Sequence, residues 1–216
     1  MQVKICGVCR PEDAAVVSEA GADCIGVILA PGSRRTLGLD DARAVLAPAR
    51  HLTKVGVFVD APFDTVAHAV SHLGLDVVQL HGNESPEDVA RLKQLAVVWK
   101  AIRVKEPDDV TAAAEAYVAA DALLLDAWHP AQAGGTGIAL DWQAIAGQRN
   151  RIRPPLRLVL AGGLTPDNVA AAARVVRPDV VDVSSGVETA PGIKSAERIH
   201  AFIAAAHSAL ASPTES

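Results

Sequence analysis

The sequence is poor in aromatic residues, which make up 3% of its 216 residues, although hydrophobic residues make up 50%. The apolar content is therefore mostly Ala, Val and Leu, which favours thin helices packed against Val-rich strands. The length suits either one barrel-sized domain or two small ones, because about 150 residues per domain is only a soft guide. Composition alone leaves both arrangements open.

The chain also lacks an excess of positive charge, since 20 Lys and Arg stand against 25 Asp and Glu, for a net charge of -5. This balance argues against a nucleic-acid footprint and against a polybasic membrane surface. The chain has no run of about eighteen apolar residues, and it enters a strand pattern at once, without the segments of a signal peptide. We therefore predict a cytoplasmic protein with no nucleic-acid partner and no membrane partner.

Cysteine is scarce, with the three residues Cys6, Cys9 and Cys24. A small and odd number argues against a secreted disulfide framework, so reduced thiols are expected. Cys6-Gly7-Val8-Cys9 has the C-x-x-C spacing of thioredoxin-like redox sites and of zinc sites. A structural zinc site needs a second pair of ligands, which the scattered histidines do not supply. The sequence therefore predicts no metal site, and a redox dithiol would suit a shorter chain.

What the sequence does contain is an alternation of short apolar runs and helical patterns. The runs are rich in Val, Ile and Leu without strict alternation, which is typical of parallel strands buried on both faces. The predicted strands span residues 3–6, 24–29, 54–59, 76–80, 97–104, 122–126, 156–160 and 180–184. The predicted helices span residues 11–20, 39–47, 62–73, 85–95, 107–118, 141–147, 165–176 and 194–210.

Eight strand–helix units are most simply closed into an α/β fold of the (β/α)8 or TIM-barrel type. An open, doubly wound sheet is the alternative. No segment rich in Pro, Gly and Ser divides the chain. We therefore predict a single barrel domain over residues 1–210, followed by a frayed C-terminal tail over residues 211–216.

In such a barrel the working residues lie at the C-terminal strand ends and in the loops that follow. Cys6 and Asp126 end the first and sixth predicted strands, so both should point into the same mouth. A thiol and a carboxylate there can share proton removal and donation, provided that nearby cations hold the thiol partly as thiolate. Lys4, Arg10 and Arg35 are candidates for those cations. The alternatives are a buried small side chain for Cys6 and a turn residue for Asp126.

Two stretches with glycine follow the seventh and eighth predicted strands, at residues 161–164 and 184–188. Loops in these places commonly bind phosphate through backbone N–H groups, and glycine lets the oxygens approach closely. A third loop, residues 134–137, could contact the same phosphate or act as a lid. The alternative is that the glycines only shape tight turns. The candidate phosphate-binding residues are Gly135, Gly162, Gly163, Ser184, Ser185 and Gly186.

Polar residues at two further strand ends are candidates for orienting a substrate. Arg35, in the loop after the second predicted strand, could hold a carboxylate through its bidentate fork. Gln79 and His81 end the fourth predicted strand and could orient hydroxyl groups or an aromatic amine. An exposed basic loop and a simple turn are the alternatives for these two places.

The ordered set of motifs is more specific than any one of them. It comprises Lys4-Ile5-Cys6-Gly7, Ser33 with Arg35, Gly56-Val57-Phe58-Val59, Gln79-Leu80-His81-Gly82, Leu125-Asp126, Gly134-Gly135-Thr136-Gly137 with Asp141-Trp142, Leu160-Ala161-Gly162-Gly163-Leu164, and Asp182 to Gly192. From about Val3 to Phe202 the chain resembles the phosphoribosylanthranilate isomerase family. The resemblance implies a (β/α)8 enzyme of tryptophan biosynthesis that uses no metal and no organic cofactor.

The implied reaction is an aldose–ketose isomerisation, the Amadori rearrangement of N-(5-phosphoribosyl)anthranilate to 1-(2-carboxyphenylamino)-1-deoxy-D-ribulose 5-phosphate. By position, Cys6 resembles the general base that takes the C2′ proton, and Asp126 resembles the general acid that opens the furanose ring. Arg35 would hold the anthranilate carboxylate, and the glycine loops would bind the phosphate. The implied partner is this small phosphoribosyl substrate, and the chain would be a monomer or a homodimer.

Three positions depart from the family pattern. Cys9 stands where Thr is usual, so a Cys6–Cys9 disulfide is conceivable under oxidation. Arg34 stands where Pro is usual, which leaves open whether Arg34 or Arg35 holds the carboxylate, and Leu29 replaces an aromatic residue. Two other functions stay open: a non-catalytic phosphosugar-binding barrel, and a dual tryptophan and histidine pathway isomerase, whose pattern has an aspartate in place of Cys6.

Overall fold

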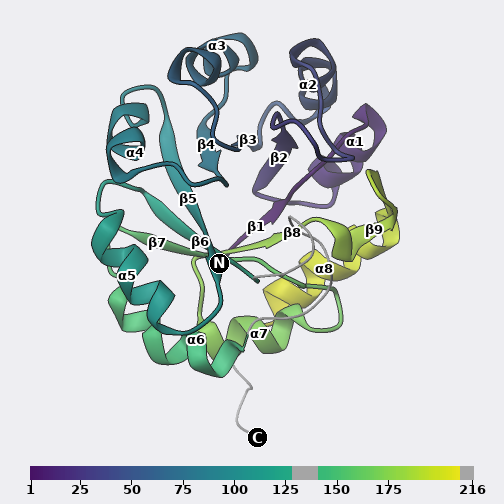
Figure 1. Ribbon diagram of the computed structural model, residues 1–216. Helices are drawn as coiled ribbons and strands as arrows, with labels where there is room; N and C mark the ends of the chain where they lie inside the picture. The colour runs from purple at the N-terminus through teal and green to yellow at the C-terminus, as the bar shows by residue number, and fades with distance from the viewer. Residues whose placement is uncertain (128–140, 210–216) are drawn as a thin grey trace, which may run out of the picture.

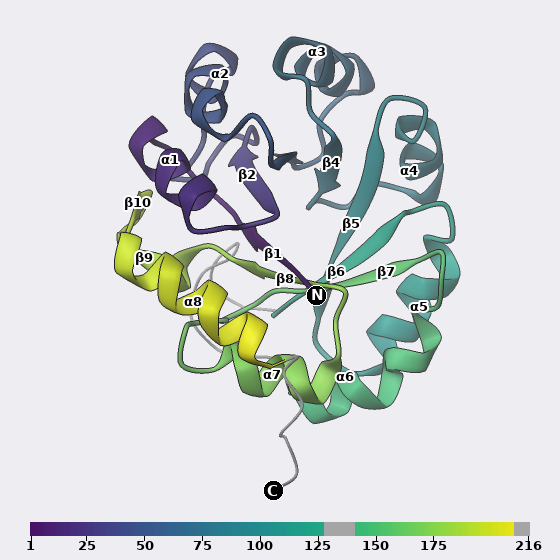
Figure 2. The same cartoon turned by 180° about the vertical axis from the view of Figure 1, so that it is seen from behind.

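The computed structural model describes residues 1–127 and 141–209, and its strands form a barrel ringed by helices (Figures 1 and 2). The strands are β1 (Gln2–Ile5), β2 (Cys24–Ile28), β3 (Thr53–Phe58), β4 (Val77–Leu80), β5 (Val97–Val104), β6 (Ala122–Ala127), β7 (Arg157–Leu160) and β8 (Val180–Val183). The helices are α1 (Pro11–Glu19), α2 (Leu39–Leu46), α3 (Phe63–Leu73), α4 (Pro86–Leu92), α5 (Asp108–Ala116), α6 (Trp142–Gln148), α7 (Val169–Val176) and α8 (Ala196–Ser208). Short 3-10 turns follow α2, α6 and β8.

The first and last strands of the barrel pair with each other. β1 runs parallel to β8, with Gln2 opposite Val180 and Ile5 opposite Val183, and β1 also runs parallel to β2. The ribbon shows the two ends of the colour scale, purple β1 and yellow-green β8, side by side (Figure 1). The predicted single-domain (β/α)8 barrel is therefore confirmed, and the open doubly wound sheet is wrong. The predicted tail, residues 211–216, lies outside the described residues.

Most predicted strand and helix boundaries lie within two residues of those observed, and the largest difference, at the start of α7, has a local cause. α4 ends at Leu92, before the predicted 95. α7 begins at Val169 instead of 165, because Asn168 first closes a turn by accepting from the Thr165 backbone N–H at 2.8 Å. The last predicted helix begins at Ala196, with Ser195 as its N-cap, and not at Lys194.

Lys194 instead belongs to an antiparallel hairpin that the sequence patterns did not predict. The hairpin is formed by β9 (Glu188–Ala190) and β10 (Ile193–Lys194), which pair with each other and, among the described residues, with no barrel strand. The turn between them contains Pro191 and Gly192, whose φ of 82° places it in the left-handed region that favours glycine. A short 3-10 turn, Ser185–Val187, joins β8 to the hairpin, so the hairpin stands at the C-terminal end of the barrel.

The side chains of the strands divide into two cores. One set packs between the strands and the helices and includes Val3, Ile5, Val98, Leu123 and Leu125. The other set fills the barrel interior and includes Cys24, Val55, Val77, Trp99, Ala101, Ala122, Leu124, Val159 and Val180. Successive side chains of a strand point to opposite faces, so the interior positions recur every second residue. Beyond this interior core, the next inward-facing residue of each strand lies at its C-terminal end and reaches the mouth of the barrel.

At the opposite end of the barrel, four aspartates join neighbouring strands in the same way. Each precedes an even-numbered strand and accepts a backbone N–H from the odd-numbered strand before it. The pairs are Asp23 with Val3 at 2.8 Å, Asp76 with Lys54 at 2.8 Å, Asp121 with Val98 at 2.9 Å and Asp179 with Leu158 at 2.7 Å. Backbone N–H groups at the N-terminal ends of the odd-numbered strands, which the sheet leaves unpaired, thus find an acceptor. The same contact recurs once in each pair of strands, so the barrel consists of four similar quarters.

Candidate active site

A cavity of about 440 Å³ opens at the C-terminal ends of the strands. It is lined by ten of the predicted site residues: Cys6, Arg35, Gln79, His81, Asp126, Gly162, Gly163, Ser184, Ser185 and Gly186. The eleventh, Gly135, lies outside the described residues, as does the rest of its loop. Arg103 and Asp182 also line the cavity, each on an interior strand position. The alternation along the strands therefore delivers residues from widely separated parts of the chain to one mouth.

Beneath Cys6 lies a buried ion pair. Lys4 is fully buried, and its Nζ atom lies 2.9 Å and 3.0 Å from the two carboxylate oxygens of Asp182. Gly26, on the neighbouring strand, leaves the space that these side chains occupy. A Cβ atom at Gly26 would lie 3.0 Å from the Cys6 Sγ atom and 3.2 Å from Lys4 Nζ. The thiol is thus held against a buried ammonium group.

Burial and the neighbouring charge act on the Cys6 thiol in opposite directions. Burial raises the pKa of Cys6 above its ordinary value, and the positive charge of Lys4 opposes that rise without overcoming it. For Lys4 the balance is reversed: burial disfavours its charge, but Asp182 and Cys6 outweigh burial and raise its pKa. That nearby cations hold Cys6 partly as thiolate stays a prediction, and the charges of Lys4 and Lys194 both favour the thiolate.

Two of the three predicted cations, Lys4 and Arg35, interact with Cys6. The third, Arg10, forms hydrogen bonds of 3.0 Å and 2.6 Å with Asp13 instead. Lys194 takes its place: the Nζ atom donates to the Cys6 carbonyl oxygen at 2.7 Å. The sequence analysis missed Lys194 because it assigned this residue to a helix. A single lysine in a short hairpin also has no sequence pattern that would mark it as a site residue.

Lys194 also joins a buried cluster with Glu188 and Arg35. Lys194 Nζ lies 2.9 Å from Glu188 Oε1, and Arg35 grips the same carboxylate with Nε at 2.8 Å and an Nη atom at 2.6 Å. Burial favours the neutral acid, but the hydrogen bond from Arg35 and the charge of Lys194 outweigh it and lower the pKa of Glu188. The guanidinium of Arg35 is thus already arranged to bind a carboxylate through two N–H groups. Arg34, beside it in sequence, is exposed.

On the other side of the cavity, Asp126 is connected to β4. The Nε2 atom of His81 lies 3.3 Å from Asp126 Oδ2, and the His81 Nδ1 atom lies 3.0 Å from the amide nitrogen of Gln79. The second carboxylate oxygen, Oδ1, accepts the Ala127 backbone N–H at 2.9 Å. The carboxylate is therefore held in one orientation, with Oδ2 directed to the histidine.

The loops after β7 and β8 are packed so closely that glycine is required. Gly162 has a φ of 78°, and a Cβ atom there would lie 2.5 Å from the Ala127 backbone nitrogen. A Cβ atom on Gly186 would collide with the Leu164 carbonyl oxygen. These glycines therefore shape the loops, as the alternative interpretation held, and the same loops bring Gly163, Ser185 and their backbone groups to the cavity rim. The two interpretations are compatible.

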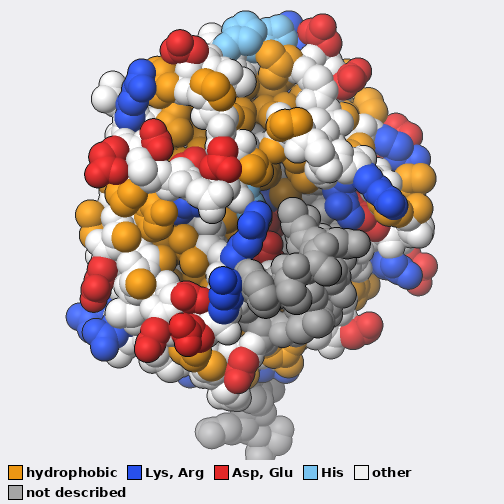
Figure 3. All heavy atoms as spheres, viewed as in Figure 1, with side chains coloured by type: hydrophobic (Ala, Val, Ile, Leu, Met, Phe, Trp, Pro, Cys, Tyr) orange, Lys and Arg blue, Asp and Glu red, His pale blue; other side chains and the backbone are white. Residues whose placement is uncertain are grey.

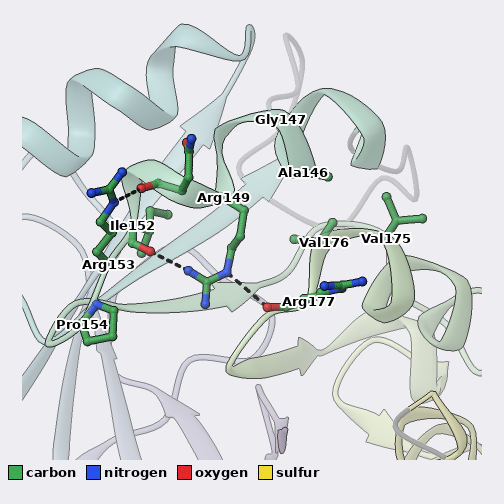
Figure 4. A pocket seen from close by; sticks show the side chains of 10 residues that line it. Ala146, Gly147, Arg149, Ile152, Arg153, Pro154, Val175, Val176 and Arg177 are labelled. Atoms are coloured by element: carbon green, nitrogen blue, oxygen red, sulfur yellow. Dashed lines mark hydrogen bonds between the residues drawn. The ribbon is translucent and has the colours of Figure 1, made fainter. Parts of the chain in front are cut away.

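A second, more open cleft of about 570 Å³ lies far from these residues (Figure 4). It is formed around the C-terminal ends of α6 and α7, which lie toward the N-terminal ends of the strands because the helices run against them. The guanidinium of Arg149 donates to the carbonyl oxygens of Ile152 and Arg177, and Arg153 donates to that of Asn150. Arg153 thus fixes the backbone of its own segment, and Arg149 also joins its segment to the end of α7. In barrels, residues at this end serve stability, whereas chemistry takes place at the C-terminal end.

The described residues show no other kind of site. Within residues 1–127 and 141–209, no helix is long and apolar enough to cross a membrane, and no His, Cys, Asp and Glu side chains are grouped to hold a metal ion. Cys6, Cys9 and Cys24 are all free thiols. On the face shown in Figure 3, Lys and Arg side chains are interspersed with Asp and Glu and do not gather into one patch.

Comparison with known proteins connects this geometry to one family. A family model described as N-(5'phosphoribosyl)anthranilate (PRA) isomerase matches residues 3–205. The N-(5'-phosphoribosyl)anthranilate isomerase of Chromohalobacter salexigens is 48% identical over 206 residues, which cover 94% of this chain and 92% of the relative. That of Thiobacillus denitrificans is 45% identical over 207 residues, covering 95% of this chain and 98% of the relative.

Solved structures agree with the sequence relatives. The crystal structure of phosphoribosyl anthranilate isomerase from Thermotoga maritima has a TM-score of 0.89 at 39% identity, covering 96% of this chain and 99% of that one. A phosphoribosyl anthranilate isomerase in complex with reduced 1-(o-carboxyphenylamino)-1-deoxyribulose 5-phosphate has a TM-score of 0.85 at 37% identity, with the same coverage of both chains. Because these matches cover nearly its whole length, the chain belongs to the N-(5'-phosphoribosyl)anthranilate isomerase family.

Proposed function

We propose that the chain catalyses the Amadori rearrangement of N-(5-phosphoribosyl)anthranilate to 1-(2-carboxyphenylamino)-1-deoxy-D-ribulose 5-phosphate in tryptophan biosynthesis, by general acid–base catalysis. The observation that carries the mechanism is that the Cys6 thiol and the Asp126 carboxyl line one cavity whose rim contains the glycine loops after β7 and β8. A structural relative bound to a reduced form of the product supports the substrate class. The direct test is turnover of phosphoribosylanthranilate by the purified chain, and a non-catalytic phosphosugar-binding barrel would give none.

Asp126 and Cys6 act in sequence. Protonated Asp126 gives its proton to the furanose ring oxygen, the C1′–O bond breaks, and the anthranilate nitrogen lone pair forms the C1′ iminium. Cys6 thiolate then takes the C2′ proton, and the electron pair of that C–H bond moves to form the enolamine. The Cys6 thiol then returns its proton to C1′ while the C2′ hydroxyl gives its proton to the Asp126 carboxylate, which forms the ketone and restores both groups. Two protons are donated and two are removed, so the cycle needs a base and an acid but no oxidant.

The remaining cavity residues hold the two ends of the substrate. The carboxylate of the anthranilate takes the place of Glu188 on the fork of Arg35, and Glu188 then keeps Lys194 as its partner at 2.9 Å. The phosphate is bound by backbone N–H groups around Gly162, Gly163, Ser185 and Gly186, with Ser184 beside them and Gly135 as a further candidate. Holding both ends places C2′ beside the thiol, which is the positioning that a proton transfer requires.

Arg35→Lys is expected to raise KM by roughly 10- to 100-fold with a smaller effect on kcat, because lysine keeps the charge but loses the bidentate fork. The matched control is Arg34→Lys, since Arg34 is the exposed neighbour, and its KM should change by less than about twofold. Steady-state kinetics on both variants measure the difference. Equal effects at both positions, or a larger effect at Arg34, would assign the carboxylate contact elsewhere.

The thiolate fraction of Cys6 should rise with pH. Burial raises the pKa of Cys6, so the thiolate fraction is small at neutral pH and should increase about tenfold per pH unit until the pH passes the raised pKa. Because turnover also needs Asp126 in its acid form, kcat/KM does not report this ionisation alone. The rate of Cys6 alkylation by iodoacetamide from about pH 6 to about pH 9 measures it directly, with Cys6→Ser as the blank for Cys9 and Cys24. An alkylation rate that has already reached its plateau at about pH 8 would contradict a raised pKa.

The remaining expectations concern partners and location. We propose that the reaction proceeds without metal or organic cofactor, so that prolonged dialysis against a chelator leaves the rate unchanged. A monomer or a homodimer is proposed, and one structural relative is described as dimeric. We also propose a cytoplasmic location without nucleic-acid or membrane partners, in keeping with the net charge of -5.

A further inference from the structure

Gln79 is a buried polar residue for which the proposed reaction has no defined task. Its side chain is 1% exposed, and it lies on an interior position of β4, two residues before His81. Its amide nitrogen contacts His81 Nδ1 at 3.0 Å, but its Oε1 atom is buried without a hydrogen-bond partner among the described residues. Buried polar atoms are rarely left unpaired, and an exception asks for an explanation.

With the amide nitrogen of Gln79 facing His81, one tautomer of the ring fits both contacts. An amide NH2 group can only donate, so in this arrangement Nδ1 accepts from Gln79 and the neutral imidazole carries its proton on Nε2. Nε2–H then donates to Asp126 Oδ2 at 3.3 Å. This arrangement suits the ionised carboxylate, which accepts hydrogen bonds only.

Turning the Gln79 amide by half a rotation produces the complementary arrangement in almost the same space. Oε1 would then face Nδ1 and accept a proton from it, which leaves Nε2 without a proton. Nε2 would accept a hydrogen bond from protonated Asp126. Both arrangements keep two hydrogen bonds and a neutral imidazole, and they differ by the one proton on Asp126.

We propose that Gln79 and His81 form a two-state hydrogen-bond relay that positions Asp126, one state fitting the protonated acid and the other fitting the carboxylate left after ring opening. The relay deepens the proposed function and rests on its assignment of Asp126 as the acid. When Asp126 gives its proton to the ring oxygen, the ring proton of His81 exchanges from Nδ1 to Nε2 through solvent, to which its side chain is 22% exposed. No proton is gained or lost at His81, so Gln79 and His81 are positioning residues.

The surrounding structure restricts the change to the imidazole and the amide. Lys100 Nζ donates to the carbonyl oxygen of Gly82 at 2.8 Å and, more weakly, to that of Leu80 at 3.5 Å, and the His81 backbone N–H donates to the Phe58 carbonyl oxygen at 2.8 Å. The backbone on both sides of His81 is therefore fixed. The other charged or titratable groups on the elements packed around the pair are Cys6, Arg35, Asp60, Glu84, Arg103 and Asp182.

Histidine tautomers provide a direct test that needs no substrate. In ¹⁵N-labelled protein, at a pH where the imidazole is neutral, the nitrogen shifts of His81 should identify Nε2–H as the major form in the wild type; His81→Gln assigns its signals among the 7 histidines. In Asp126→Asn, the side-chain carbonyl should keep the Ala127 N–H, because that contact is formed by Oδ1. The new NH2 group then faces Nε2, so His81 should change to Nδ1–H. The same tautomer in both proteins, or Nδ1–H in the wild type, would overturn the relay.

Kinetics separate the relay from the proposed function. Gln79→Met removes the amide at similar volume and should lower kcat about tenfold with KM nearly unchanged, while the exposed matched control Gln94→Met should stay within about twofold. If Asp126→Asn retains full activity, the acid assignment fails. If Asp126→Asn is inactive but Gln79→Met keeps wild-type kcat, the acid assignment stands and the relay is wrong.

Discussion

Cys6→Ala and Asp126→Asn are each expected to lower kcat/KM by roughly 10²- to 10⁴-fold, the usual loss when a general base or a general acid is removed. Both side chains line the same cavity, and the proposed reaction has a step for each. Neither substitution should unfold the protein, because alanine fits the space of the thiol and asparagine keeps the hydrogen bond from the Ala127 backbone N–H at 2.9 Å. Steady-state rates and circular dichroism measure activity and fold together.

The matched control is Cys9→Thr, which removes the other thiol of the C-x-x-C pair. Cys9 is half-buried, and its sulfur contacts the carbonyl oxygens of Gly7 at 3.5 Å and Arg35 at 3.6 Å, contacts that a threonine hydroxyl can also make. We expect kcat/KM within about threefold of the wild type. Activity retained in Cys6→Ala, or lost to the same extent in Cys9→Thr, would contradict the assignment of Cys6 as base.

The sequence predicted the barrel because its signals are local. Strands such as β2 are continuous apolar runs, and joints such as Gly74 carry their own stop signal, a φ of 62° at the end of α3. Closure then follows from counting eight similar units. The hairpin of β9 and β10 was missed for the opposite reason, because strands of three and two residues contain too little pattern to be recognised.

For the site, the sequence predicted which residues reach the mouth but not how they pair there. The rule that chemistry collects at C-terminal strand ends placed Cys6, Arg35 and Asp126 in one cavity without any knowledge of contacts. The pairing of Lys4 with Asp182 spans 178 residues of sequence and exists only because β1 closes against β8. The effect of this ion pair on the pKa of Cys6 depends on the balance between burial and charge. That balance follows from the distances between the groups, which the sequence does not give.

The same ion pair leads to the second large expected effect, on stability. Asp182→Ala should lower the free energy of unfolding by about 3–5 kcal/mol, because it leaves the ammonium of Lys4 buried and unpaired. Lys4 is fully buried, and its salt-bridge partner has a side chain only 8% exposed, so water cannot replace the carboxylate. Urea unfolding monitored by circular dichroism measures the loss, which is a large share of the roughly 5–15 kcal/mol that stabilises a typical domain.

Replacing both partners separates stability from catalysis. Lys4→Met combined with Asp182→Leu should recover most of the lost stability, since apolar side chains of similar volume often replace a buried ion pair at little cost. Activity should not recover, because burial already raises the pKa of Cys6 and the double variant removes Lys4, the main group that opposes the rise. The rise of Cys6 alkylation with pH should then move to higher pH. If the double variant is as unstable as Asp182→Ala, the loss comes from packing around Asp182 and not from an unpaired charge. If the double variant is stable and has wild-type activity, Lys4 does not assist the thiol.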